Sequence, residues 1–189
     1  QAIHDRFAAI RHAVGAELYL EACMTPPGPV FDLVDGYRPA EDWRPGAEAV
    51  LAQELAPRHL FHGLSWNNDL EFFDPSLRPA AWDAWQNRAV QSLRSARQAA
   101  SLNAMSGYSG CIGGFLTELS DERFRIATRA VPTDATPALF LDYPEHDPPQ
   151  LWAKERTVAG QQLWVIALFN WNEHSPLERR LTGEELFAR

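Results

Sequence analysis

The chain has 189 residues, a hydrophobic fraction of 46% and a formal net charge of −8 at pH 7. This length and composition predict a folded globular protein with one ordinary domain, and they exclude an intrinsically disordered chain. The negative charge argues against nucleic-acid or anionic-membrane partners, and no apolar run approaches the roughly 18 residues of a membrane span.

The first half of the chain alternates between helical and extended patterns. Apolar residues at helical spacing precede Gly15, which predicts a helix that stops at this glycine. Short apolar runs bounded by proline, glycine and polar residues predict strands. In chain order we expect a helix over 3–14, strands over 18–23 and 30–34, a helix over 47–55, a strand over 59–64 and a polar loop over 65–69.

The second half changes its pattern towards the end. Pro79 opens a predicted helix that runs to Ala100, because proline suits the first turn of a helix. The glycine-rich stretch 103–115 predicts a strand with close neighbours, and Ser120 before two acidic residues predicts another helix start. Residues 151–155 and 162–171 then predict strands without a helix between them.

Helix and strand alternate in the first part as the βα units of a parallel sheet do. The sequence therefore predicts an α/β part over residues 1–143. The tail from about Pro144 lacks this alternation, and we expect residues 144–189 to begin a separate antiparallel, β-sandwich-like domain.

Cysteine and histidine spacing predicts no metal site. Cys23 and Cys111 lie in apolar or small-residue runs, which predicts buried free thiols and matches no zinc-binding spacing. His59 and His62 are three residues apart, so on a strand their side chains would point to opposite faces.

The segment from Val34 to Trp43 contains the strongest candidate functional residues. Arg38 and Asp42 would lie together where a strand runs into a loop. The guanidinium favours the ionised carboxylate, whereas burial against Trp43 would raise its pKa, and such opposing effects tune acid/base residues of carbohydrate sites. On spacing alone, a solvated loop with a surface ion pair is the simpler interpretation.

Five segments carry a family resemblance, namely Leu18-Tyr-Leu-Glu-Ala-Cys23, Leu33-Val-Asp-Gly-Tyr-Arg38-Pro-Ala-Glu-Asp42, Ser65-Trp-Asn-Asn-Asp69, Gly113-Gly-Phe-Leu-Thr-Glu-Leu-Ser-Asp-Glu-Arg123 and Ala167-Leu-Phe-Asn-Trp171. In this order they resemble segments of the α-galactosidase-type glycoside hydrolases, family 36 and its relatives in clan D. The second is similar to the family's Val-Asp-Gly-x-Arg-x-x-x-Asp segment, and the third to its Trp-Asn-Asp-Pro-Asp loop. Together the five segments extend over most of the chain.

The resemblance implies a fold and a chemistry. The fold would be the second half, strands five to eight, of a (β/α)8 barrel, followed by part of an antiparallel β domain. The chemistry would be retaining hydrolysis of an α-galactoside or a related oligosaccharide, without metal or cofactor. By motif, Asp42 falls on the acid/base, and Arg38 on the residue that contacts the sugar and that carboxylate. Asp69, Trp66 and Cys23 fall on substrate-binding positions, although Trp66 is also open to a structural role.

The chain departs from the family pattern in two places. The family's Pro-Asp is replaced by Asp69-Leu70-Glu71, which leaves the register of the sugar-binding aspartate open. Its nucleophile lies in a Lys-x-Asp segment on the fourth strand, and no such segment occurs in this chain. We therefore expect the chain to be inactive alone and to need the missing N-terminal half of the barrel, or a second copy of the chain.

Two other interpretations of the sequence remain. One is a non-catalytic carbohydrate-binding or assembly module derived from such an enzyme, which has kept Arg38, Trp66 and Asp69. The other is an unrelated α/β domain whose short motifs match by chance.

Overall fold

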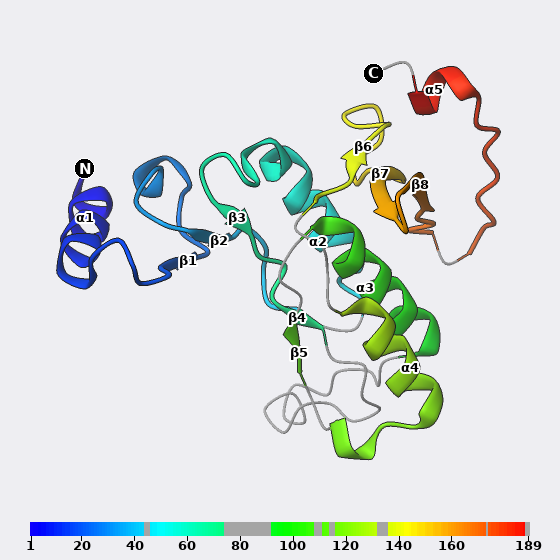
Figure 1. Ribbon diagram of the computed structural model, residues 1–189, viewed down its shortest axis with the longest axis horizontal. Helices are drawn as coiled ribbons and strands as arrows, with labels where there is room; N and C mark the ends of the chain where they lie inside the picture. The colour runs from blue at the N-terminus through cyan, green and yellow to red at the C-terminus, as the bar shows by residue number, and fades with distance from the viewer. Residues whose placement is uncertain are drawn as a thin grey trace.

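The computed structural model describes residues 1–43, 46–73, 92–107, 111–113, 116–131, 136–172 and 174–187. It is a small α/β protein with one sheet near the N-terminus and another near the C-terminus, separated by helices (Figure 1). Among the described helices, none has the length and apolar composition that crossing a membrane requires.

The N-terminal sheet is parallel, in the order β1-β2-β3. Helix α1 precedes it and ends at Gly15, whose φ of 79° suits glycine. A 3-10 helix, η1, follows β1, and α2 continues into a second 3-10 helix, η2, before β3. The bounds are α1 Ala2–Val14, β1 Glu21–Cys23, η1 Gly28–Val30, β2 Gly36–Arg38, α2 Glu48–Leu55, η2 Ala56–Phe61 and β3 Asn67–Asn68.

A hydrophobic cluster covers one face of this sheet. Its buried members are Ala22, Val30, Val34, Tyr37 and Trp66. Phe7 of α1 packs against the cluster together with partly buried residues of the loops. The parallel sheet is therefore covered on one side by α1 and its neighbouring turns.

Two helices and a small parallel sheet follow. Helices α3 (Leu93–Ser106) and α4 (Asp121–Ala130) lie side by side, and β4 (Phe72–Phe73) pairs with β5 (Cys111–Ile112) (Figure 1). Each helix begins with a serine side chain that accepts a hydrogen bond from the backbone N–H three residues on. Both starts are therefore fixed by N-caps.

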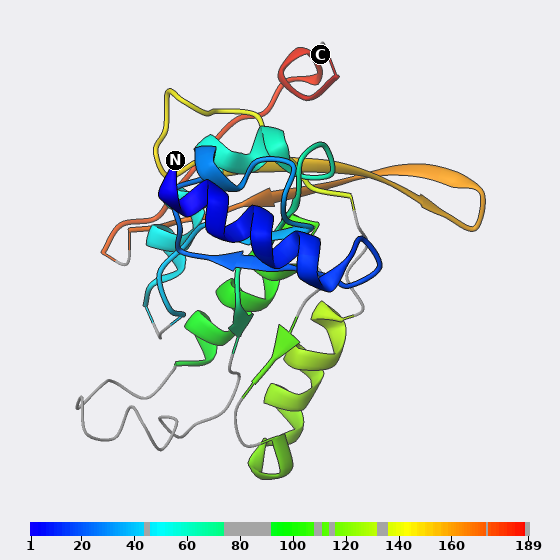
Figure 2. The same cartoon turned by 90° about the vertical axis from the view of Figure 1, so that its left-hand side faces the viewer.

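The C-terminal sheet is antiparallel, and its β7–β8 hairpin projects from the body (Figure 2). The N-terminal half of β7 is buried, and Trp152 joins the larger hydrophobic cluster of α2, α3 and α4. Strand β8 is exposed along most of its length. The bounds are η4 Leu116–Glu118, β6 Leu139–Phe140, β7 Leu151–Val158, β8 Gln161–Leu168 and α5 Gly183–Phe187.

Lys154 of β7 ties this strand to the end of α3. Its side chain is buried, and Nζ donates hydrogen bonds to the carbonyl of Ala104 at 2.7 Å and to that of Thr136 at 3.1 Å. A cation at the carboxyl end of a helix is favoured by the helix dipole.

The predicted second half of a (β/α)8 barrel is wrong. The described strands form separate parallel sheets of three and two strands, plus the antiparallel sheet, and not four consecutive strands of one curved sheet. Strands β1 to β5 have only two or three residues each. Among the described residues, β3 and β4 are not hydrogen-bonded to each other, so the two parallel sheets stay separate. The division of the chain into domains near residue 143 stays a prediction.

Several predicted elements are confirmed and others are wrong. The helices over 3–14 and 47–55, the helix start at Ser120 and the paired strands of the tail are confirmed. Residues 59–64 are not a strand, because α2 continues through Pro57 as a 3-10 helix, and a short strand occurs instead in the predicted polar loop. The predicted strand over 30–34 is wrong, since the strand begins later, at Gly36. The strand predicted over 103–115 is confirmed only at Cys111–Ile112, because α3 extends to Ser106.

Two more predictions concern side chains and the middle of the chain. Cys23 and Cys111 are not joined by a disulfide, but both are exposed, so their predicted burial is wrong. They stand on short strands whose outward faces are open. The part of the predicted Pro79 helix over residues 79–91 lies outside the described residues.

Candidate functional site

The uncovered face of the β1–β2–β3 sheet gathers the candidate functional residues. Side chains alternate along a strand, so the register partners Ala22 and Tyr37 point into the hydrophobic cluster. The partners Cys23 and Arg38 therefore lie on the opposite face. We name this opposite face the polar sheet face, and its members are Glu21, Cys23, Gly36, Arg38, Asn67 and Asp69.

Asp69 reaches this face because the backbone pairing continues past β3. Its N–H donates a hydrogen bond to the carbonyl of Tyr37 at 2.9 Å. Asp69 therefore lies beside Arg38 at the carboxyl ends of parallel strands, where α/β proteins generally bind ligands.

Arg38 connects two carboxylates at this edge. One guanidinium nitrogen lies 2.8 Å from Asp42 Oδ1, and the other lies 2.7 Å from Glu71 Oε1. The Arg38 and Glu71 side chains are 13% and 16% exposed, whereas that of Asp42 is 53% exposed. Arg38 thus holds Glu71 inside the site and Asp42 at its rim.

Glu21 and Asp69 form a pair of carboxyl groups joined by a hydrogen bond. Burial, this hydrogen bond and the negative charge of Asp69 raise the pKa of Glu21 from 4.5 to about 7, while Arg38 opposes the shift. Two neighbouring carboxyl groups cannot both ionise easily, so Glu21 keeps its proton to a higher pH than an ordinary glutamate. The pair can therefore present a donor and an acceptor together near neutral pH.

Glu71 is a third carboxyl group in a partly buried setting. Burial raises its pKa, although the N–H of Trp43 and the charge of Arg38 act in the opposite direction. The N–H of Glu71 in turn donates a hydrogen bond to Asp69 Oδ1. This contact fixes Asp69 next to the guanidinium of Arg38.

Tyr19 closes the other end of the face. Its phenol packs over Gly36, and a Cβ atom at this position would force the Tyr19 side chain to move aside. A hydrogen bond joins Tyr19 to Asn67, and burial raises the pKa of the phenol. The hydroxyl therefore adds a further polar group beside Glu21.

The structure brings together four of the five predicted site residues. Arg38, Asp69 and Cys23 lie on the polar sheet face, and Asp42 lies at its rim. Asp42 is not buried against Trp43 as the sequence interpretation supposed, because the indole turns into the larger hydrophobic cluster and the carboxylate remains in solvent.

Trp66 does not belong to the site. It is 3% exposed, its ring lies 4.8 Å from those of Phe31 and Tyr37, and its Nε1 donates to Asn68 Oδ1 at 2.8 Å. Both the ring and its polar atom are therefore used inside the protein. Of the two roles that the sequence left open for Trp66, substrate binding and structure, its surroundings support the structural one.

Three residues of this candidate site were not identified from the sequence: Tyr19, Glu21 and Glu71. Glu21 and Cys23 are two apart on a strand, which places them on one face, and Glu71 is two residues after Asp69. This spacing could have identified both glutamates once the strands were placed.

No metal centre forms around these residues. Within the described ranges, no three histidine, cysteine, aspartate or glutamate side chains are arranged to hold a metal ion. His62 Nδ1 accepts a hydrogen bond from the Asn68 N–H at 3.0 Å, and His59 packs on Phe140 with ring centroids 4.3 Å apart. The two histidines thus have separate structural surroundings.

Comparisons with known proteins do not identify a family for this chain. No model of a known protein family matches the chain, and no curated protein sequence matches it either. A functional proposal must therefore be argued from the polar sheet face and from the five short segments that resemble glycoside hydrolases.

Proposed function

We propose that the polar sheet face binds an α-galactoside or a related α-glycoside and supplies the acid/base chemistry of a retaining glycoside hydrolase. The observation that carries this proposal is the arrangement of Glu21, Asp69, Glu71 and Asp42 around a single guanidinium. Glycoside hydrolysis requires a pair of carboxyl groups of which one is protonated and the other is ionised.

Asp42 is the proposed acid/base. It occupies the motif position of that residue, and its exposed position at the rim leaves room for a leaving group to approach. Arg38 holds the carboxylate in place through the 2.8 Å contact. In the first step Asp42 would give a proton to the glycosidic oxygen, and in the second it would take one from water.

The Glu21–Asp69 pair is the proposed sugar-binding element. A sugar hydroxyl both donates and accepts hydrogen bonds, and a protonated Glu21 beside the Asp69 carboxyl group offers both kinds of partner. Charge-assisted hydrogen bonds of this kind are stronger than neutral ones. The pair would therefore orient the sugar relative to Asp42.

The chemistry is tested by replacing the missing nucleophile with formate. Because no Lys-x-Asp segment occurs in the chain, the 189-residue protein should release no phenol from phenyl α-galactoside in plain buffer. Added formate can attack the anomeric carbon in place of a carboxylate. We expect formate-dependent phenol release that Asp42→Asn lowers by about 100-fold, the usual size of a general-acid contribution.

The leaving group supplies the internal control. 2,4-Dinitrophenol departs without a proton, so its release should be nearly equal in the original protein and in Asp42→Asn. A variant of an exposed acid outside the site, Glu178→Gln, should behave as the original protein with both substrates. Equal loss with both leaving groups, or no dependence on formate at all, would refute acid/base catalysis by Asp42.

A non-catalytic carbohydrate-binding module is the second candidate. The 53% exposure of the Asp42 side chain favours it, because a general acid usually has a raised pKa from burial. Binding of methyl α-galactoside that Asp69→Asn weakens, without formate-dependent release, would establish this candidate and exclude the first.

A further inference from the structure

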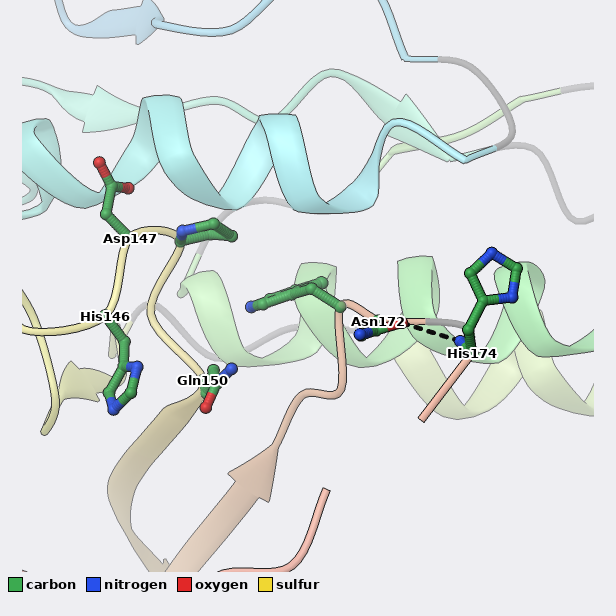
Figure 3. A pocket seen from close by; sticks show the side chains of 7 residues that line it. His146, Asp147, Gln150, Asn172 and His174 are labelled. Atoms are coloured by element: carbon green, nitrogen blue, oxygen red, sulfur yellow. Dashed lines mark hydrogen bonds between the residues drawn. The ribbon is translucent and has the colours of Figure 1, made fainter. Parts of the chain in front are cut away.

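A cavity far along the chain from the polar sheet face lies between the β6–β7 loop and the segment after β8. Its volume is about 510 Å³, within the range of small-molecule sites. Figure 3 shows the side chains on its two sides. The lining consists of His146, Asp147, Pro148, Gln150, Trp171, Asn172 and His174.

The loop that forms one side is held by a buried carboxylate. Asp142 Oδ1 accepts the N–H groups of Gln150 at 3.1 Å and Leu151 at 3.0 Å, and Oδ2 accepts from Arg179 at 2.7 Å. The Asp142 carbonyl also accepts the N–H of His146 at 2.8 Å. The cavity wall is thus fixed before any ligand arrives, which reduces the entropy lost on binding.

The other side is held by stacked aromatic rings. Trp171 is parallel to Phe169, with ring centroids 4.9 Å apart, and its Nε1 donates to the Pro149 carbonyl at 3.0 Å. Phe169 belongs to the larger hydrophobic cluster. One face of the indole is therefore covered, and the partly exposed remainder lines the cavity.

The polar groups of the lining are mostly uncharged. Gln150 and Asn172 contribute amides and the two histidines contribute imidazoles, each able to donate or accept a hydrogen bond. Among the described lining residues, Asp147 is the single carboxylate, and its Oδ2 accepts from Gln53 of α2 at 3.4 Å. In Figure 3 Asp147 points towards that helix, away from Asn172 and His174.

We infer that this cavity is a second binding site, for a neutral saccharide. An apolar ring surface next to several amide and imidazole groups matches a sugar, which has an apolar C–H face and a rim of hydroxyl groups. The described lining holds no arginine or lysine to pair with an anionic ligand, and its one carboxylate turns towards α2, so it offers little charge for a cation. This inference is independent of the proposed function, because it uses none of the residues of the polar sheet face.

The test is an NMR titration of the ¹⁵N-labelled chain with raffinose, a neutral trisaccharide. We expect the indole N–H signal of Trp171 and the side-chain amide signals of Gln150 and Asn172 to shift, with a dissociation constant in the millimolar range. Nuclear Overhauser contacts should join sugar C–H protons to the Trp171 ring. Glu21→Gln in the polar sheet face should leave these shifts unchanged.

Variants separate the pocket from the rest of the surface. Gln150→Ala and His174→Ala keep the backbone hydrogen bonds of the loop, and each should weaken raffinose binding about fivefold, the effect of one lost hydrogen bond. The matched control is Gln162→Ala, an exposed glutamine of β8 that does not line the cavity. The spectrum of each variant reports whether it is folded.

Two results would overturn the inference. One is the absence of pocket shifts up to about 50 mM raffinose, beyond the weakest affinity expected for a specific site. The other is binding that persists at equal affinity in both pocket variants. Loss of sugar binding at the polar sheet face alone would leave the inference about this cavity unchanged. The two proposals can therefore fail independently, and the experiments show which of them has failed.

Discussion

Glu21 makes the stability of the protein depend on pH in an unusual direction for an acid. Its pKa is about 7 in the folded protein and 4.5 as the ordinary value. Between these values the folded state holds a proton that the unfolded state has lost. The contribution of Glu21 to the free energy of unfolding is therefore fully present below pH 4.5 and is lost as the pH rises through 7. We expect Glu21→Gln to remove this part of the pH dependence.

The measurement is urea unfolding at a series of pH values from 4 to 8, with the exposed-site variant Glu178→Gln as control. In Asp69→Asn, a ¹³C titration of the Glu21 carboxyl should show its pKa falling towards the ordinary value, because the neighbouring negative charge is gone. An unchanged Glu21 titration in Asp69→Asn would contradict the pairing.

His59 has the opposite effect at lower pH. Burial, with a smaller contribution from the charge of His62, lowers its pKa from 6.5 to about 4. The unfolded state then binds a proton that the folded state excludes, so stability is lost as the pH falls from 6.5 to 4. The shift corresponds to at most about 3 kcal/mol.

Chemical unfolding at pH 5 and pH 7 checks this expectation. His59→Gln should flatten the difference between the two pH values, whereas the exposed His174→Gln should leave it as it is. If the free energy of unfolding differs between pH 5 and pH 7 by the same amount in the original protein and in His59→Gln, other groups cause the acid sensitivity.

At the level of single residues, part of the site could be predicted from the sequence, but its centre could not. Arg38 and Asp42 are four positions apart, so their ion pair follows from local geometry. The Glu21–Asp69 pair joins β1 to the end of β3, and its proton depends on a contact that no local pattern encodes. The burial of Trp66 depends in the same way on rings from elsewhere in the chain.

Among the elements, the carboxyl end of α3 depends on a single glycine. Gly107 has a φ of 78°, and a Cβ atom at this position would collide with the backbone of Thr136 and Pro137. Gly160, in the β7–β8 turn, has the same φ of 78° but open space around it. A comparison of substitutions at the two glycines therefore separates the cost of backbone strain from the cost of steric overlap.

We expect Gly107→Ala to lower the free energy of unfolding by about 3 kcal/mol or more, and Gly160→Ala by about 1 kcal/mol. Thermal and urea unfolding of the two variants would measure this difference. Equal losses would mean that the segment after α3 moves aside without cost.

Helices were easier to predict than strands because their signals are local. Ser120, the acidic residues after it and Gly15 act within one turn of the helices that they delimit. Strands of two or three residues have no periodicity to detect, and a short apolar run such as 59–64 fits a strand or a 3-10 turn equally well.

Over the whole molecule, the two sheets are supported by hydrophobic clusters of different size. The cluster under β1–β3 has five buried residues, whereas the cluster of α2, α3, α4 and β7 is much larger. Regions with less buried apolar surface open at lower free energy. We therefore expect the N-terminal sheet to open before the helical core.

Native-state hydrogen exchange measures this order. Amides of residues 21–38 should exchange faster than those of α3, and addition of urea should leave the α3 amides protected until global unfolding. Uniform protection across both regions would show that the molecule unfolds as one unit.

The arrangement of sheets could not be predicted from the sequence. Alternating helices and strands favour one parallel sheet, but the pairing partner of each strand is decided by contacts distant in sequence. Phe72–Phe73 pairs with Cys111–Ile112 and not with Asn67–Asn68, although the latter strand is only four residues away. The two paired strands of the tail were predicted correctly because they pair across a tight turn.

Lys154 is the only lysine of the chain, and it is enclosed between β7 and α3. A reagent that acylates amines should therefore not modify this side chain in the native protein. A lysine adduct, visible by mass spectrometry, would form only when the chain around β7 comes apart. The protein thus carries its own chemical reporter of unfolding in this strand.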